Sequence, residues 1–344
     1  EMCIRDRYNT GLDASFLKGK LRFTVDVYQK YIKDLLQKKV KMPTSIGYGN
    51  GYEVSYMNSG KMTNKGWEFR VDAVPFENRD WRVGFYFNIA HNENKITEMP
   101  DNYTEENYTF NNGEYAYRRE EGRPMGSFYG YRYKGVCQNK DATYARDADG
   151  NVMKDISGNA IVMRNGTATI APGDALYEDI NHDGVINQYD IVYLGNSNPR
   201  FTGGAGVNVS YKQFKLSAIF YGRYGQDVVN STRLNNESMR GIDNQSTAVL
   251  RRWRNEGDQT DIPRALYGEG YNTLGSDRFV EDASYLRLKS LSFNYRLPKK
   301  IIQRWGFSNI DVYVTGYNLF TWTKYTGQDP EVKTENTYAR DSAT

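Results

Sequence analysis

Cysteine and histidine, which build many catalytic and metal sites, are scarce: the 344 residues include two of each. Cys3 and Cys137 provide neither a disulfide framework nor a CxxC motif. There is no run of about 18 apolar residues, which excludes a transmembrane helix. With 45 basic and 42 acidic residues the net charge is +3, so the composition implies no nucleic-acid partner.

Motifs of the common enzyme classes are also absent. The sequence has no GxSxG, no HExxH, no P-loop and no GxGxxG behind a predicted strand. His91 and His182 stand far apart in the chain, and acidic pairs such as Glu105 and Glu106 lie in polar stretches where solvated charge is expected. We therefore predict that the protein is not an enzyme.

What the sequence does have is alternation of apolar and polar residues with a period of two. In the segment from Trp81 to Ile89, for example, apolar residues take every second position. This pattern is typical of strands with one apolar and one polar face. It predicts eight strands, at 12–16, 21–27, 67–73, 81–89, 207–211, 214–221, 291–296 and 310–315.

The connections between these strands alternate between short and long. Short links are expected at 17–20, 77–80, 212–213 and 298–308, whereas 33–64, 92–199, 224–281 and 322–344 are long and polar. Short turns at one end and long loops at the other are typical of an outer-membrane β-barrel. A soluble β-sandwich with large insertions explains the alternation equally well, but explains the regular order of connections less well.

Two details refine this prediction. Leu286 and Leu288 are out of phase with Leu291 and Phe293, which predicts either a β-bulge near Lys289 or Ser290 or a strand that rises out of the membrane there. Aromatic residues near the strand ends fit the girdles that flank the apolar band of a barrel; they are Trp67, Trp81, Tyr211, Phe214, Phe320 and Trp322.

The segment DINHDGVINQYD, residues 179–190, has the spacing of a calcium-binding loop. The candidate ligands are the side chains of Asp179, Asn181, Asp183 and Asp190 and the backbone carbonyl of Val185, with Gly184 at the sharp turn. We predict a structural Ca²⁺ ion here. The alternative is a turn rich in Asp and Asn that closes itself by hydrogen bonds from side chain to backbone.

Four segments together resemble the SusC/RagA family of TonB-linked outer-membrane transporters of Bacteroidetes. They are GRPMGSFYGY from residue 122, the stretch 172–206 with DINHDGVIN and GNSNPRFTGG, DASYLRLKSLSFNYRLP at 282–298, and VYVTGYNLFTW with KYTGQDPE at 312–331. Their order and wording match that family over nearly the whole chain after Arg7.

The resemblance implies an all-β fold: about eight strands, roughly the fourteenth to twenty-first, of a transmembrane antiparallel barrel of about twenty-two strands. It also implies a SusD-like lipoprotein partner, import of an oligosaccharide or peptide ligand, and energy from TonB–ExbB–ExbD through a plug. Trp, Phe and Val side chains would face outer-membrane lipid. Polar side chains would line the lumen or hold the plug; these are Arg22, Asp26, Glu68, Arg70, Asp72, Arg82 and Asn88.

Residues 1–7, with MCIRDR, read as a non-native translated adapter by their own wording. The resemblance implies that 8–344 is a partial receptor barrel domain with 92–199 as a large extracellular loop region. We expect a fragment open at both ends that lacks the plug and the TonB box. Aromatic residues of the large loop are candidates for stacking on sugar rings or for packing within the loop; they are Tyr103, Tyr108, Phe110, Tyr115 and Tyr117.

Two other functions stay open at this point. One is a soluble secreted calcium-binding β-sandwich, either an adhesin or a carbohydrate-binding module, which would need no detergent. The other is a passive porin, which would have no plug encoded upstream.

Overall fold

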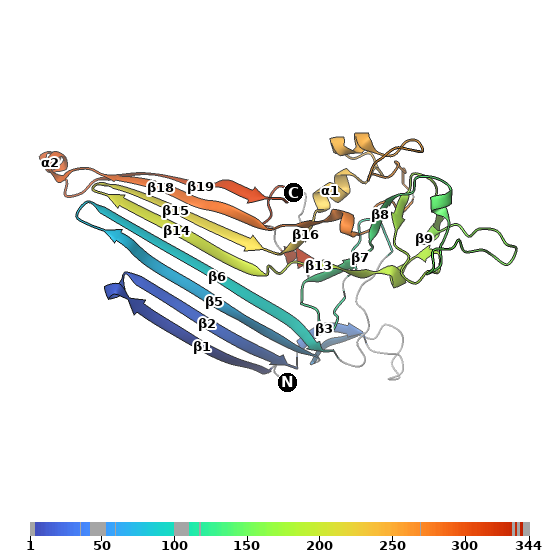
Figure 1. The fold of residues 1–344 in the computed structure, drawn as a ribbon, viewed down its shortest axis with the longest axis horizontal. Helices are drawn as coiled ribbons and strands as arrows, with labels where there is room; N and C mark the ends of the chain where they lie inside the picture. Colours follow the sequence, from blue (N-terminus) through green and yellow to red (C-terminus); the bar gives the residue numbers. More distant parts are fainter. Residues whose placement is uncertain are drawn as a thin grey trace.

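The computed structural model describes residues 4–34, 36–41, 53–58, 60–99, 110–116, 118–268, 270–331, 334–335 and 338–339. Eight long strands form one antiparallel sheet in which spatial order follows chain order (Figure 1). They are β1 (Ile4–Phe16), β2 (Leu21–Lys33), β5 (Lys61–Glu77), β6 (Trp81–Glu98), β14 (Phe201–Tyr211), β15 (Phe214–Tyr224), β18 (Tyr285–Arg296) and β19 (Asp311–Thr323). Each predicted strand coincides with one of these, so the eight-strand prediction is confirmed.

The register of the sheet separates two faces. One row across all eight strands is apolar throughout: Ala14, Phe23, Val71, Phe87, Ala205, Phe220, Leu288 and Phe320. The adjacent row points to the other side: Asp13, Thr24, Arg70, Asn88, Gly204, Tyr221, Arg287 and Thr321. Because side chains alternate along a strand, these rows define an apolar face and a polar face.

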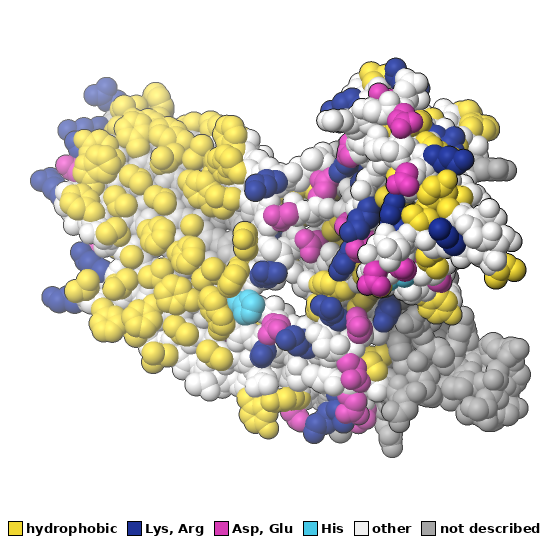
Figure 2. All heavy atoms as spheres, turned by 45° about the vertical axis from the view of Figure 1, so that its right-hand side comes forward, with side chains coloured by type: hydrophobic (Ala, Val, Ile, Leu, Met, Phe, Trp, Pro, Cys, Tyr) yellow, Lys and Arg dark blue, Asp and Glu magenta, His cyan; other side chains and the backbone are white. Residues whose placement is uncertain are grey.

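The apolar face has no second layer over it among the described residues. Many of its large side chains are 36–71 % exposed, among them Leu12, Phe16, Val27, Phe85, Val207, Phe214, Leu216, Phe293, Val314, Phe320 and Trp322. Figure 2 shows hydrophobic side chains gathered over the long strands, with charged side chains concentrated beyond them. A β-sandwich would bury such a face against another sheet, so the sandwich alternative is wrong.

The length of the strands suits a bilayer. From Phe201 to Tyr211, β14 advances about 33 Å at roughly 3.3 Å per residue. A strand tilt of about 40° turns this into about 25 Å of height, which is the height of the apolar band of an outer-membrane barrel. No helix in the described ranges has the length and apolar character needed to cross a membrane.

Bulges keep the pattern in phase where the sequence departs from it. The predicted bulge near Lys289 is confirmed, because the register of β18 shifts between Leu288 and Ser290. The extra residue returns Leu286 and Leu288 to the same face as Leu291 and Phe293. A second shift in β5, between Ala73 and Phe76, accommodates Pro75, which has no N–H to donate to a ladder.

The two ends of the sheet differ as predicted. At the turn end, hairpins close through η1 (Leu17–Gly19), residues 78–80, residues 212–213, and a link that contains α2 (Lys299–Ile302) and η7 (Gln303–Trp305). At the loop end, β6 continues to Glu98, so the large loop begins at residue 99 and not at 92. Residues 4–7, which we assigned to an adapter, pair with residues 30–33; pairing does not bear on their origin, which stays a prediction.

The two longest connections fold together into an outer body of residues 110–200 and 225–284. Its elements are β7 (Ser127–Gly130) paired with β13 (Val192–Asn196), β8 (Tyr133–Val136) with β11 (Ala175–Tyr177), and β16 (Asp227–Val229) with β17 (Val280–Asp282). A third small sheet joins β9 (Arg164–Asn165), β10 (Ala168–Thr169) and β12 (Val185–Ile186). The helices are η3 (Asp141–Thr143), η4 (Gln188–Asp190), α1 (Ser231–Asn236), η5 (Thr247–Arg251) and η6 (Asp277–Phe279).

Hydrophobic cores explain why these segments are folded. One core gathers Tyr131, Ala145, Met163, Ile170, Ala175, Tyr177, Ile186 and Leu274, and a second gathers Tyr115, Phe128, Val229, Leu234 and Phe279. Both combine residues of the two connections, so each connection completes the core of the other. Short strands outside this body are β3 (Leu36–Lys41) paired with β4 (Glu53–Asn58), and β20 (Thr334–Glu335) with β21 (Tyr338–Ala339).

Candidate functional site

The predicted calcium loop lies in the outer body and is ordered by its own side chains. The Asp179 carboxylate accepts from the backbone N–H of Gly184 at 2.8 Å and of Asp183 at 3.3 Å. Asn181 Oδ1 accepts from Asp183 N–H at 3.1 Å, and Asp183 Oδ1 accepts from Val185 N–H at 2.8 Å. Gly184 has φ 81°, as the turn position requires. Four of the five predicted ligand positions, Asp179, Asn181, Asp183 and Val185, thus lie on one tight turn.

Asp190, at the last ligand position, lies fully buried behind this turn. Its two carboxylate oxygens accept from Ile180 N–H and Asn187 N–H, each at 2.8 Å. The second bond is half of a capping box at the start of η4, whose other half is the Asn187 side chain. Burial raises the pKa of Asp190, although the backbone N–H groups oppose that rise.

These bonds are those expected of the self-closed turn that we gave as the alternative to a metal site. Within the described residues, no group of three or more His, Cys, Asp or Glu side chains is gathered tightly enough to hold a metal. Two of the five predicted donors, the Asn181 amide and the Val185 carbonyl, are of other chemical types. The calcium ion therefore stays a prediction.

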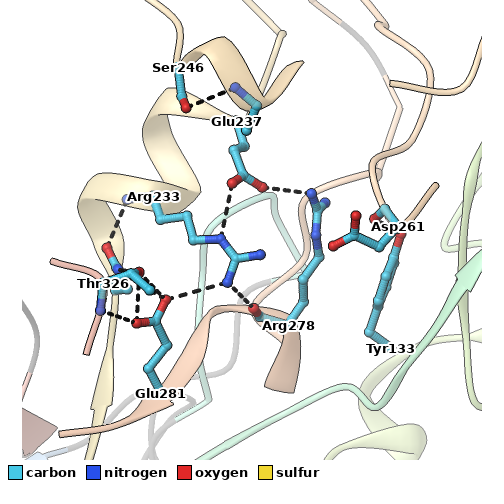
Figure 3. A network of polar contacts seen from close by, with 10 residues as sticks. Tyr133, Arg233, Glu237, Ser246, Asp261, Arg278, Glu281 and Thr326 are labelled. Carbon is cyan, nitrogen blue, oxygen red and sulfur yellow. Dashed lines mark hydrogen bonds and ion pairs between the residues drawn. The ribbon is translucent and has the colours of Figure 1, made fainter. Parts of the chain in front are cut away.

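A buried ionic network joins α1, η6 and β17 of the outer body to the segment that follows β19 (Figure 3). Glu237, at the end of α1, pairs with Arg233 at 3.0 Å and with Arg278 at 2.7 Å. Arg233 also reaches Glu281 of β17 at 3.3 Å, and Glu281 accepts from Thr326 N–H at 2.9 Å. The Arg278 and Glu237 side chains are only 3 % and 5 % exposed, so each depends on the other for neutralisation.

A second cluster holds the segment that follows β19 against the polar face. Arg287 of β18 pairs with Asp329 at 2.5 Å and Glu331 at 2.9 Å, and it donates to the Thr321 hydroxyl at 3.0 Å. Lys289, at the bulge, lies 3.8 Å from Glu331. The bulge therefore keeps the apolar residues in phase and also places a cation beside this segment.

The polar face carries the predicted lumen residues. Register partners show that Arg22, Asp26, Glu68, Arg70, Asp72, Arg82 and Asn88 all lie on it. Arg70 and Asp72 pair at 2.7 Å within β5. Tyr86 lies over Gly206 on the neighbouring strand, where an added Cβ would come within 2.0 Å of the ring. This glycine lets the tyrosine lie along the wall of the sheet.

The aromatic residues predicted for the large loop have mixed outcomes. Tyr103, Tyr108 and Tyr117 lie outside the described residues. Phe110 stacks edge-to-face on Tyr271 at 4.6 Å, and Tyr115 is buried in the second core of the outer body. For these two residues, packing within the loops is the observed role.

Sequence reasoning missed the ionic network. Arg233, Glu237, Arg278 and Glu281 are spread over 49 positions, 233–281, and fit no motif. Charged residues are mostly exposed, so only burial in the folded body distinguishes these four. The predicted girdle residues, in contrast, contact one another: Trp81 and Tyr211 pair across β6 and β14 with ring centroids 4.3 Å apart, and Phe320 and Trp322 are neighbours on β19 with centroids 6.1 Å apart.

Comparison with known proteins agrees with this geometry. No protein-family model matches the chain. It is 32 % identical over 336 residues to TonB-dependent receptor P3 of Formosa agariphila, covering 95 % of this chain and 30 % of that receptor. It is 26 % identical over 336 residues to TonB-dependent receptor SusC of Bacteroides thetaiotaomicron, covering 95 % and 29 %.

Solved structures give the same match. The structure of the RagAB peptide transporter aligns with a TM-score of 0.67 and 26 % identity, covering 95 % of this chain and 32 % of that chain. The RagAB peptide importer in its closed-closed state aligns with a TM-score of 0.70 and 25 % identity, covering 98 % and 34 %. The chain spans about 30 % of the length of the receptors it matches. It is a segment of the β-barrel of a SusC/RagA-type TonB-dependent receptor, a protein of the outer membrane.

Proposed function

We propose that the receptor containing this chain imports a nutrient, an oligosaccharide or a peptide, across the outer membrane. The observation that carries the proposal is the eight-stranded wall with one exposed apolar face and one polar face. Such a wall separates lipid from an aqueous lumen. Its similarity to SusC and to the RagAB peptide transporter supports nutrient import over other uses of a barrel.

In this proposal the chain supplies wall and outer loops and catalyses no bond chemistry. Arg70, Asp72 and their neighbours on the polar face line the lumen or contact the plug. Energy comes from TonB–ExbB–ExbD acting on the plug of the full receptor. The folded outer body is the surface offered to a SusD-like lipoprotein that caps the channel, and the similarity to SusC and to the RagAB peptide transporter supports a partner of that kind.

Deletion and complementation test this function. Cells that lack the receptor gene, or the gene of a neighbouring SusD-like lipoprotein, are expected to lose growth on the imported glycan or peptide. The full gene should restore growth, and extraction of the receptor from cell membranes should require detergent. A receptor that is released into buffer without detergent contradicts the proposal.

The same strains separate active import from a passive porin. Deletion of tonB is expected to abolish uptake of the substrate while leaving the receptor in the outer membrane at its normal level. Uptake that is unchanged without TonB favours the porin.

We also propose that loop 179–190 holds a structural Ca²⁺ ion. The carboxylate oxygens of Asp179 and Asp183 each accept N–H groups, yet an ionised carboxylate has about four acceptor sites and retains capacity for a cation. Ca²⁺ accepts amide and carbonyl oxygens such as those of Asn181 and Val185 beside carboxylates. The ion would stiffen the outer body without entering the transport step.

Protease sensitivity tests the calcium proposal. The double variant D179A/D183A is expected to insert into the membrane normally but to be cleaved faster in the outer body. Wild type should show the same faster cleavage after chelation of calcium. Cleavage of wild type at equal rates with and without calcium contradicts the site.

A further inference from the structure

The apolar face is not uniformly filled. Near the loop end of β14, β15 and β18 it has an open hollow of about 680 Å³. Its walls are large side chains of the apolar face: Phe87, Phe201, Phe220, Leu286 and Trp322. The hollow therefore opens toward lipid and not toward the lumen.

Glycines produce the hollow. Gly203 of β14 and Gly222 of β15 are direct register partners, and both line it. A Cβ at Gly203 would come within 2.6 Å of the Asn88 carbonyl oxygen, and one at Gly222 within 2.8 Å of the Tyr285 carbonyl oxygen. Neither position accepts a side chain without backbone movement, so the floor stays bare between bulky neighbours.

The rim on the outer-body side combines two aromatic residues with a lysine. Trp322 and Tyr224 are 53 % and 61 % exposed, as is typical of residues at a membrane interface. Lys324, directly after β19, lines the hollow, and the structure gives it no ion-pair partner among the residues it describes. Asp282 also lines the hollow, and its carboxylate accepts from Ser284 N–H at 2.8 Å.

We propose that this hollow binds an acyl chain of lipid A, the phosphorylated lipid of the outer leaflet, with a phosphate against Lys324. The inference rests on the proposed function, because the loop end must face the cell exterior. An acyl chain in the hollow would pack against its exposed apolar walls, and burial of this apolar surface favours binding. Anionic phosphate complements the charge of Lys324 at the level where the apolar face ends.

Native mass spectrometry of the full-length receptor, purified in mild detergent and titrated with lipid A, tests this site. Wild type is expected to retain one lipid A molecule more tightly than the variant A205F, whose ring would fill the hollow from β14. The matched control A218F adds the same ring to the apolar face of β15 outside the hollow, and should retain lipid A as wild type does. K324E should weaken retention at least fivefold, because it removes a basic residue that contributes roughly 1 kcal/mol near an anionic surface and also adds a negative charge.

The outcomes are distinct. Equal retention of lipid A by wild type, A205F and K324E overturns the proposal, as does equal retention of phosphatidylethanolamine and lipid A by wild type. The heat-dependent gel shift of each variant shows whether its barrel is folded. In a folded variant, loss of the lipid A adduct is therefore not caused by misfolding. Substrate uptake by the same variants is measured separately. Failed uptake by wild type refutes the import function, whereas normal uptake with no lipid A adduct refutes only this site.

Discussion

Replacing Arg278 by methionine is expected to destabilise the outer body while leaving the barrel wall intact. Methionine keeps much of the side-chain volume but removes the charge that faces Glu237 at 2.7 Å. Both side chains are almost fully buried, so Glu237 would retain only its bond to Arg233 at 3.0 Å. Breaking one partner of a buried pair costs about 3–5 kcal/mol, and we expect the lower end because Arg233 remains.

A cost of about 3 kcal/mol raises the population of the opened outer body roughly 100-fold, at 1.4 kcal/mol per tenfold. Hydrogen exchange of the full-length receptor in detergent measures this directly. Amides of α1 and β17 should exchange faster by about that factor, whereas amides of β14 and β15 should not change. The exposed pair Arg132–Glu178 provides a matched control, because R132M should cost only about 0–1 kcal/mol.

The double variant R278M/E237L separates charge from packing. It removes both buried charges and leaves Arg233 paired with Glu281 at 3.3 Å. Replacing a buried ion pair by apolar residues is often neutral or stabilising, so exchange should return most of the way to wild type. The reasoning is refuted if R278M behaves like R132M, or if the double variant is as unstable as R278M alone.

Three further predictions follow from the same structure. V207R, in the middle of the apolar face, should destabilise the barrel in liposomes by about 2–4 kcal/mol in urea titration, whereas N208R on the polar face should change little; equal effects would contradict the assignment of faces. Burial raises the pKa of Cys137 to about 11, so at pH 8 only about one thiol in a thousand is ionised, and iodoacetamide should label it, by mass spectrometry, only after unfolding. Burial also raises the pKa of Asp227. The stability of the folded outer body should therefore fall as pH rises from about 4 through that raised pKa. Hydrogen exchange measured across this pH range should show the fall in wild type and a flatter dependence in D227N.

The sequence by itself determined the eight strands and their faces, and it located the break in phase near Lys289 that the structure shows to be a bulge. It could do so because side-chain direction alternates with a period of two, and because one face must be apolar along the whole strand. Phe87 and Asn88 can be assigned to opposite faces from their neighbours alone. The turn at Gly184 could also be predicted, because its Asp and Asn side chains accept hydrogen bonds from backbone N–H groups only a few positions away.

Only the tertiary structure decided what the long connections do. The partner of Arg278 is Glu237, 41 positions away, and Leu274 shares a core with Ala145 from the other connection. Contacts of this kind depend on how two segments fold against each other, and the periodicity of the sequence does not predict them. The hollow beside Gly203 has the same origin, since it requires Gly222 on the next strand and Trp322 two strands further on.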